Sequence, residues 1–189
     1  MTMAMHTVTE SPTGDAAHPH ILVAGLGNSI LMDDGIGVHA TLALQDTAEP
    51  GVCAAEIGTA VLDGLHLFEW ADKILAIDAM EAGGRPGDIY LIEESGLAGG
   101  GPIQASMHEL SLKAALRFTQ QPVAGEIVIL GVEPAEIDYG LELTPPLQAA
   151  LPRVATLARR IVQYWRDQSS CDAGSLEQLV AEVLAEPVV

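Results

Sequence analysis

The sequence of 189 residues is poor in basic residues and cysteine, and each scarcity excludes a class of protein. Only 8 Lys and Arg stand against 26 Asp and Glu, which gives a formal net charge of −18. Such a chain repels phosphate backbones and acidic membranes, so we expect no nucleic-acid and no membrane partner. Its two cysteines make neither a disulfide framework nor a Cys-x-x-Cys pair. A basic protein partner or a cation remains compatible with this charge.

Long apolar runs are also missing. No stretch approaches the roughly 20 residues that span a bilayer. The first residues lack the basic segment followed by an apolar run that is typical of signal peptides. We therefore expect a cytoplasmic protein.

Small aliphatic residues dominate what is present. Hydrophobic residues make up 49% of the chain and aromatic residues only 4%, a composition that favours close packing of helices on a sheet. The length suits one core. We expect a disordered leader over 1–19, a single α/β domain over 20–166, and an acidic tail over 167–189 with an amphipathic helix.

Buried-strand patterns alternate with helical patterns along the domain. Strands are predicted at 20–25, 52–57, 73–78, 88–92 and 126–131, and helices from near Asp34, at 60–70, at 107–119 and at 144–166. Asp33 is a candidate N-cap for the first helix. Thr144, which precedes Pro145, is a candidate N-cap for the last helix. This alternation predicts a three-layer α/β fold: a twisted, mostly parallel five-stranded sheet with helices on both faces, of phosphorylase/hydrolase-like type.

Three polar residues fall at the carboxyl ends of predicted strands, where sites collect in open parallel sheets. Asp34 lies in the turn after the first strand, and Asp78 ends the third strand. His108 lies in Ser106-Met-His-Glu109, a capping-box pattern that puts it in the first turn of a helix. Two carboxylates and one imidazole suit a divalent metal such as zinc or nickel, with positions left open for water or substrate.

Each of these residues also has a purely structural interpretation. Asp34 alone is better explained as a helix cap than as a site residue. For Asp78 alone, a turn cap and a site residue are equally good explanations. A single histidine is more often structural than a ligand. Their convergence on one edge of the sheet favours the functional interpretation.

Other chemistries have weaker patterns. No Gly-x-Ser-x-Gly elbow and no His-Glu-x-x-His helix occurs, and Cys53 fits a small buried hydrophobe better than a nucleophile. Gly25-Leu-Gly27 follows the first strand, but Ile30 replaces the third glycine of a dinucleotide-binding turn. His39 is near the first turn, although a surface position fits it better.

The string Gly25-Leu-Gly-Asn28-Ser-Ile-Leu-Met-Asp33-Asp34-Gly-Ile-Gly37-Val resembles the opening of the nickel-iron hydrogenase maturation endopeptidases. The resemblance covers roughly 20–165. Further matching motifs follow in order: Gly58-Thr59-Ala60, Ile77-Asp78-Ala79, Pro86-Gly87, Met107-His108, Gly131-Val-Glu-Pro134 and Leu143-Thr144-Pro145. One departure is Glu56-Ile57, where many members have Asp-Gly.

The resemblance implies a specific reaction. Members of this family cut a short C-terminal extension from the hydrogenase large-subunit precursor after nickel insertion. At matching positions, Asp34, Asp78 and His108 would be the catalytic, metal-contacting residues, with nickel supplied by the precursor. Another divalent ion such as zinc or cadmium would also fit this donor set. The proton acceptor is left open between Asp33 and one of the ligands.

Two rival functions remain. A non-enzymatic chaperone would use the same contacts to bind the nickel-loaded precursor without cutting it. A peptidyl-tRNA hydrolase shares the Gly-Leu-Gly-Asn opening, but its Arg-His-Asn string is missing here and the charge opposes tRNA.

Overall fold

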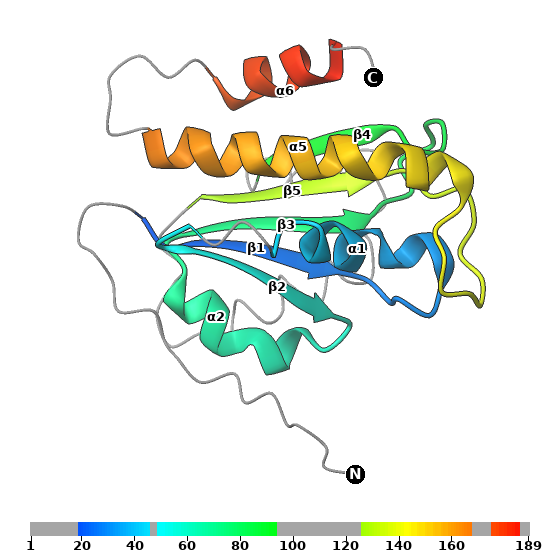
Figure 1. The fold of residues 1–189 in the computed structure, drawn as a ribbon, viewed down its shortest axis with the longest axis horizontal. Coiled ribbons are helices and arrows are strands. Elements are labelled where there is room, and N and C mark those ends of the chain that lie inside the picture. The colour runs from blue at the N-terminus through cyan, green and yellow to red at the C-terminus, as the bar shows by residue number, and fades with distance from the viewer. Residues whose placement is uncertain (1–18, 46–48, 94–125, 168–174, 186–189) are drawn as a thin grey trace.

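The computed structural model describes residues 19–45, 49–93, 126–167 and 175–185. Its elements, in chain order, are β1 (Ile21–Leu26), η1 (Met32–Gly35), α1 (Ile36–Leu42), β2 (Val52–Gly58), η2 (Val61–Gly64), α2 (Leu65–Trp70), β3 (Lys73–Ala79), β4 (Ile89–Glu93), β5 (Ile127–Val132), α5 (Pro145–Asp167) and α6 (Leu176–Ala185). The strands form one sheet in the order β2-β1-β3-β5-β4, in which only β4 is antiparallel to its neighbour (Figure 1). The predicted five-stranded, mostly parallel sheet is confirmed.

The three central strands, β1, β3 and β5, are buried on both faces, which explains why they are almost continuous apolar runs. Alternate residues of β1 belong to two different cores: Ile21 and Val23 pack with α1, α5 and α6, whereas Leu22 and Ala24 pack with Phe68 of α2. Helices therefore cover both faces, as the sequence predicts, and the molecule has three layers.

The last two helices pack one on the other (Figure 1). α5 begins at Pro145, as predicted, and the Gln148 N–H donates to the carbonyl of Thr144 to close its first turn. The predicted amphipathic helix of the tail is α6. Its residues Leu176, Val180 and Val183 are buried in the core that includes α5, and Arg153 of α5 donates to the carbonyl of Leu184. None of the helices described has both the length and the apolar character to cross a bilayer.

The first two predicted helices differ from expectation at their starts. Each opens with a turn of 3-10 helix, η1 or η2, before a short α-helix of seven or six residues. A glycine, Gly35 or Gly64, ends each 3-10 turn. The predicted helix at 107–119 lies outside the described residues.

Candidate active site

The turn after β1 brings Asp34, which follows the first strand, close to Asp78 of the third strand. β1 and β3 are parallel neighbours with Gly25 opposite Ile77, so the chain at Gly27 passes beside Asp78. Gly27 has φ +105°, and a Cβ added there would lie 1.8 Å from the carbonyl oxygen of Asp34 and 3.7 Å from Asp78 Oδ1. Asp34 and Asp78 therefore meet at a turn that only glycine can make.

Both aspartates are buried and both accept hydrogen bonds from the main chain. The Asn28 N–H donates to Asp34 Oδ2 at 2.7 Å, and the Ala79 N–H donates to Asp78 Oδ1 at 3.0 Å. These bonds orient the two carboxylates at the carboxyl edge of the sheet, toward which β1, β3 and β5 all run (Figure 1). Two buried like charges favour a cation between or beside them.

Asp33 has a different role from the one that the sequence suggests. Its carboxylate is fully buried, and it accepts from the N–H groups of Ala135, Glu136 and Thr144 at 2.7–3.0 Å and from the Thr144 hydroxyl at 2.8 Å. The predicted N-cap is wrong, because these donors belong to a distant segment and η1 has no side-chain cap. Asp33 was one of the proton acceptors left open, and the four hydrogen bonds that occupy its carboxylate disfavour it for that role.

Glu133 is a second buried carboxylate that holds a loop, and sequence reasoning missed its role. It accepts from the N–H groups of Ala82 and Gly83 at 2.9 and 3.2 Å and from the Tyr90 hydroxyl at 2.9 Å. Burial acts to raise the pKa of Glu133, but these hydrogen bonds outweigh it and lower the pKa overall. Burial, and then the bond to Glu133, raise the pKa of Tyr90 to about 12. The available signal was an acid directly after a buried strand.

The family of this chain follows from comparison with known proteins. Residues 38–161 match the family model described as hydrogenase maturation protease, which is more than half of the chain. The chain belongs to the hydrogenase maturation protease family. It is thus a hydrolase that cuts peptide bonds, and the peptidyl-tRNA hydrolase alternative is set aside.

Individual relatives carry names consistent with the hydrogenase maturation protease family. The chain is 27% identical to the hydrogenase expression/formation protein HupD of Rhizobium leguminosarum bv. viciae over 163 residues, covering 82% of this chain and 79% of that protein. It is 29% identical to the coenzyme F420 hydrogenase subunit delta of Methanothermobacter thermautotrophicus over 154 residues, covering 70% of this chain and 88% of that protein.

Solved structures of maturation proteases share the fold. The hydrogenase maturating endopeptidase HybD from E. coli superposes with a TM-score of 0.66 at 24% identity, covering 80% of this chain and 99% of that one. The hydrogenase 2 maturation peptidase from Thaumarchaeota archaeon SCGC_AB-539-E09 superposes with a TM-score of 0.59 at 27% identity, covering 76% and 98%. The predicted resemblance is confirmed at the level of family and fold.

The third predicted ligand of this maturation protease, His108, lies outside the described residues. Among the residues that the structure does describe, no three His, Cys, Asp or Glu side chains form a group able to hold a metal. The structure thus brings together Asp34 and Asp78, and the ligand set of three stays a prediction. His39 lies half-buried on α1 beside Gly35, not fully on the surface.

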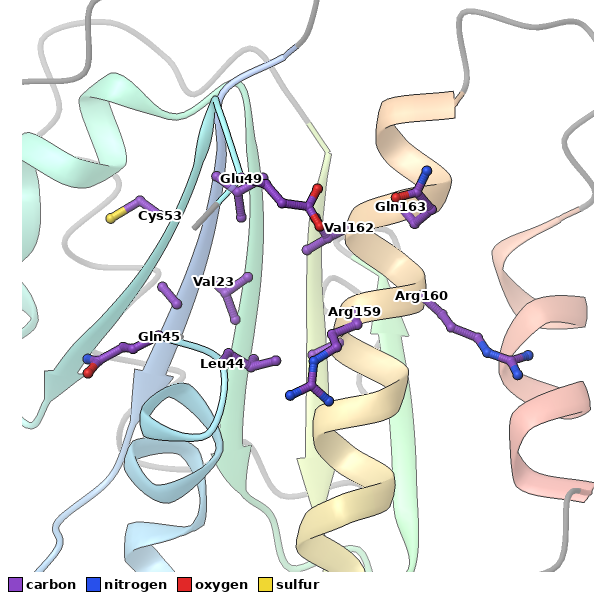
Figure 2. A pocket seen from close by; sticks show the side chains of 12 residues that line it. Val23, Leu44, Gln45, Glu49, Cys53, Arg159, Arg160, Val162 and Gln163 are labelled. Carbon is purple, nitrogen blue, oxygen red and sulfur yellow. The ribbon is translucent and has the colours of Figure 1, made fainter. Parts of the chain in front are cut away.

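A cavity of about 470 Å³ lies elsewhere in this maturation protease, between the first halves of β1 and β2 and the second half of α5 (Figure 2). Its wall includes Val23, Leu44, Cys53 and Val162 but neither Asp34 nor Asp78. Burial raises the pKa of the Cys53 thiol, which disfavours the nucleophilic thiolate. We therefore do not assign this cavity to the reaction.

Proposed function

We propose that this maturation protease removes the C-terminal extension of a nickel-iron hydrogenase large-subunit precursor after nickel has been inserted. In this proposal Asp34, Asp78 and His108 contact the nickel that the precursor carries. The supporting observation is that two buried aspartates from separate elements border the Gly27 turn: the Asn28 N–H donates to Asp34 Oδ2, and Asp78 Oδ1 lies 3.7 Å from the position of a Cβ at Gly27.

Buried carboxylates that share one turn favour a divalent cation as their counter-charge. Asp34 and Asp78 are each oriented by a main-chain bond, from the N–H groups of Asn28 and Ala79. With an imidazole from His108, they would supply O,O,N donors and leave positions for the precursor's own ligands. A precursor without nickel would lose this contact, which explains selection for the loaded form.

Hydrolysis adds water across the scissile peptide bond. Nickel held at this edge would polarise the peptide carbonyl or lower the pKa of the attacking water. The water's proton passes first to a nearby carboxylate and then to the amine that leaves as the C–N bond breaks. Since Asp33 is saturated with hydrogen bonds, Asp34 and Asp78 remain as the carboxylates for this transfer.

The same donor set would accept zinc or cadmium when no precursor is present. Calorimetric titration of the purified chain with zinc should detect one site. The variants Asp78→Asn and His108→Ala should each weaken it at least about tenfold, in line with the loss of one ligand. Equal zinc affinity in all three proteins would contradict the assignment of these ligands.

The test of the reaction follows the mass of a large-subunit precursor, nickel-loaded or nickel-free, on mixing with the purified chain. The chain should remove a C-terminal peptide from the loaded precursor only. Asp34→Asn, Asp78→Asn and His108→Ala should abolish cleavage. Asp72→Asn is the matched control, because Asp72 is exposed and directly precedes β3, at the opposite end of the strand from Asp78.

Two other outcomes would end parts of the proposal. If the loaded precursor binds but stays intact, the chaperone function replaces hydrolysis. If loaded and nickel-free precursors are cut equally fast, the three residues do not sense nickel.

A further inference from the structure

Exposed apolar side chains gather on the segment that leads into α5. Ile137, Tyr139 and Leu141 are 45%, 84% and 71% exposed, and Ile30 is 51% exposed. These are four of the six large hydrophobic side chains exposed in the described part of the chain. We call residues 136–142 together with Ile30 the 136–142 strip. A concentration of this kind is typical of an interaction surface.

The main chain of the 136–142 strip is fixed in place. The Met32 N–H donates to the Gly140 carbonyl and the Gly140 N–H donates to the Ile30 carbonyl, both at 3.0 Å. The Asp33 carboxylate accepts from the N–H group of Glu136, at one end of the strip, and from that of Thr144, two residues beyond the other end. Since the strip is already ordered, binding a partner here would cost little conformational entropy.

Acidic side chains alternate with the apolar ones. Glu136, Asp138 and Glu142 are all exposed. No lysine or arginine occurs between residues 134 and 152 to offset them. The chemistry that complements this strip is a polypeptide segment with Lys or Arg beside aliphatic or aromatic side chains. A second copy of the strip would set acid against acid, and an acidic membrane would be repelled in the same way.

The strip also adjoins the candidate active site. Asp33, which holds Glu136 and Thr144 on either side of the strip, directly precedes Asp34 in the chain. The Asp34 N–H donates to the Leu31 carbonyl at 3.1 Å. Leu31 in turn pairs with Gly140 of the strip. A polypeptide lying on the strip would therefore continue toward Asp34.

We propose that the 136–142 strip is the surface on which this maturation protease docks a basic, apolar segment of its precursor beside the cleavage site. This rests on the proposed function, because the partner is the precursor that is cut. Docking on the strip supplies binding alone, while Asp34, Asp78 and His108 contact the nickel and supply the chemistry. Changes to the strip should thus act on KM alone, whereas changes to the site should lower kcat as well as weaken binding of the loaded precursor.

The first experiment measures cleavage kinetics of the nickel-loaded precursor with the double variant Tyr139→Ser/Leu141→Ser. KM should rise at least about tenfold while kcat stays within about twofold, because binding is lost and chemistry is not. Leu42→Ser is the matched control: Leu42 is an exposed leucine, at 46%, but lies at the far end of α1. It should leave both constants unchanged, and circular dichroism should show that all variants are folded.

The second experiment tests the charges. Glu136→Gln/Glu142→Gln should raise KM at low salt about fivefold to tenfold and flatten the rise of KM with sodium chloride that the wild type shows. Glu177→Gln/Glu182→Gln removes the same two charges from exposed positions on α6 and should keep the wild-type salt dependence.

Three results would overturn the docking proposal alone. In the first, the wild type cuts the precursor and the strip variants have unchanged KM, which leaves the protease function standing. In the second, the strip variants lower only kcat. In the third, sedimentation shows a wild-type dimer that Tyr139→Ser/Leu141→Ser dissociates, which makes a second copy the occupant. A wild type that neither binds nor cuts the precursor overturns the proposed function and the docking surface together.

Discussion

Buried acidic residues at the carboxyl edge of the sheet fall into two kinds according to their hydrogen-bond partners. Asp33 and Glu133 each collect donors from a separate segment, residues 135–144 and 82–90 respectively, and so fix the loops around the site. Asp34 and Asp78 are oriented by main-chain N–H groups of Asn28 and Ala79. The first kind is structural, and the second is where we place the chemistry.

Asp33→Asn should therefore destabilise the fold. An amide in place of the carboxylate turns a donor toward the buried N–H groups of residues 135–144, and we expect a loss of about 3 kcal/mol in the free energy of unfolding. Urea denaturation measures it. Asp72→Asn, at an exposed position, should lose less than about 1 kcal/mol. If Asp33→Asn has wild-type stability but no longer cleaves the precursor, Asp33 would instead be assigned as the proton acceptor.

Glu133 and Tyr90 should give the stability a dependence on pH at both extremes. The lowered pKa of Glu133 contributes stability that is complete above its unfolded value of about 4.3 and is lost as pH falls through the folded value. The raised pKa of Tyr90, about 12 against an ordinary 10.0, contributes stability that is complete below pH 10 and is lost as pH rises through 12.

Urea denaturation across pH tests this pair. The stability difference between wild type and Glu133→Gln should shrink as pH falls below about 4.3, and that between wild type and Tyr90→Phe should shrink as pH rises above about 10. Differences that are constant with pH would show that the two side chains do not hold the 82–90 loop through ionisation-sensitive bonds.

At the scale of elements, the turn between β1 and η1 determines how Asp34 approaches Asp78. Gly27→Ala would put a methyl group 1.8 Å from the Asp34 carbonyl oxygen, so the turn must move. We expect a loss of at least about 3 kcal/mol, from overpacking added to left-handed strain. Cleavage should fall with it.

Gly83→Ala is the control for that substitution. Gly83 also has a positive φ, +83°, but a Cβ there meets nothing within 4 Å. Its cost should be the conformational strain alone, about 1–2 kcal/mol. Thermal unfolding of the two variants compares them directly, and equal losses would mean that close approach at Gly27 does not fix the turn.

For the whole molecule, local patterns predict the layers well. The strands at 21–26, 73–79 and 127–132 are apolar except for Lys73 and Asp78, because both of their faces are covered, and the buried Asp78 stands out for that reason. Asp33 could not be understood in this way, since its donors lie 102 to 111 residues away in sequence and nothing local indicates the pairing. The sequence likewise shows that Glu133 is an acidic residue directly after a strand. It does not show the hydrogen-bond partners of Glu133, because these depend on the antiparallel pairing of β4 with β5.

The central claim is that Asp34, Asp78 and His108 sense the nickel of the precursor, and the most direct measurement is the effect of nickel on precursor affinity. Binding of nickel-loaded and nickel-free precursor to immobilised wild type, Asp78→Asn and Asp72→Asn gives a thermodynamic cycle. We predict that nickel tightens binding to the wild type and to Asp72→Asn at least about tenfold, and that Asp78→Asn loses most of this gain. Equal affinity of wild type for the two precursors would contradict the claim.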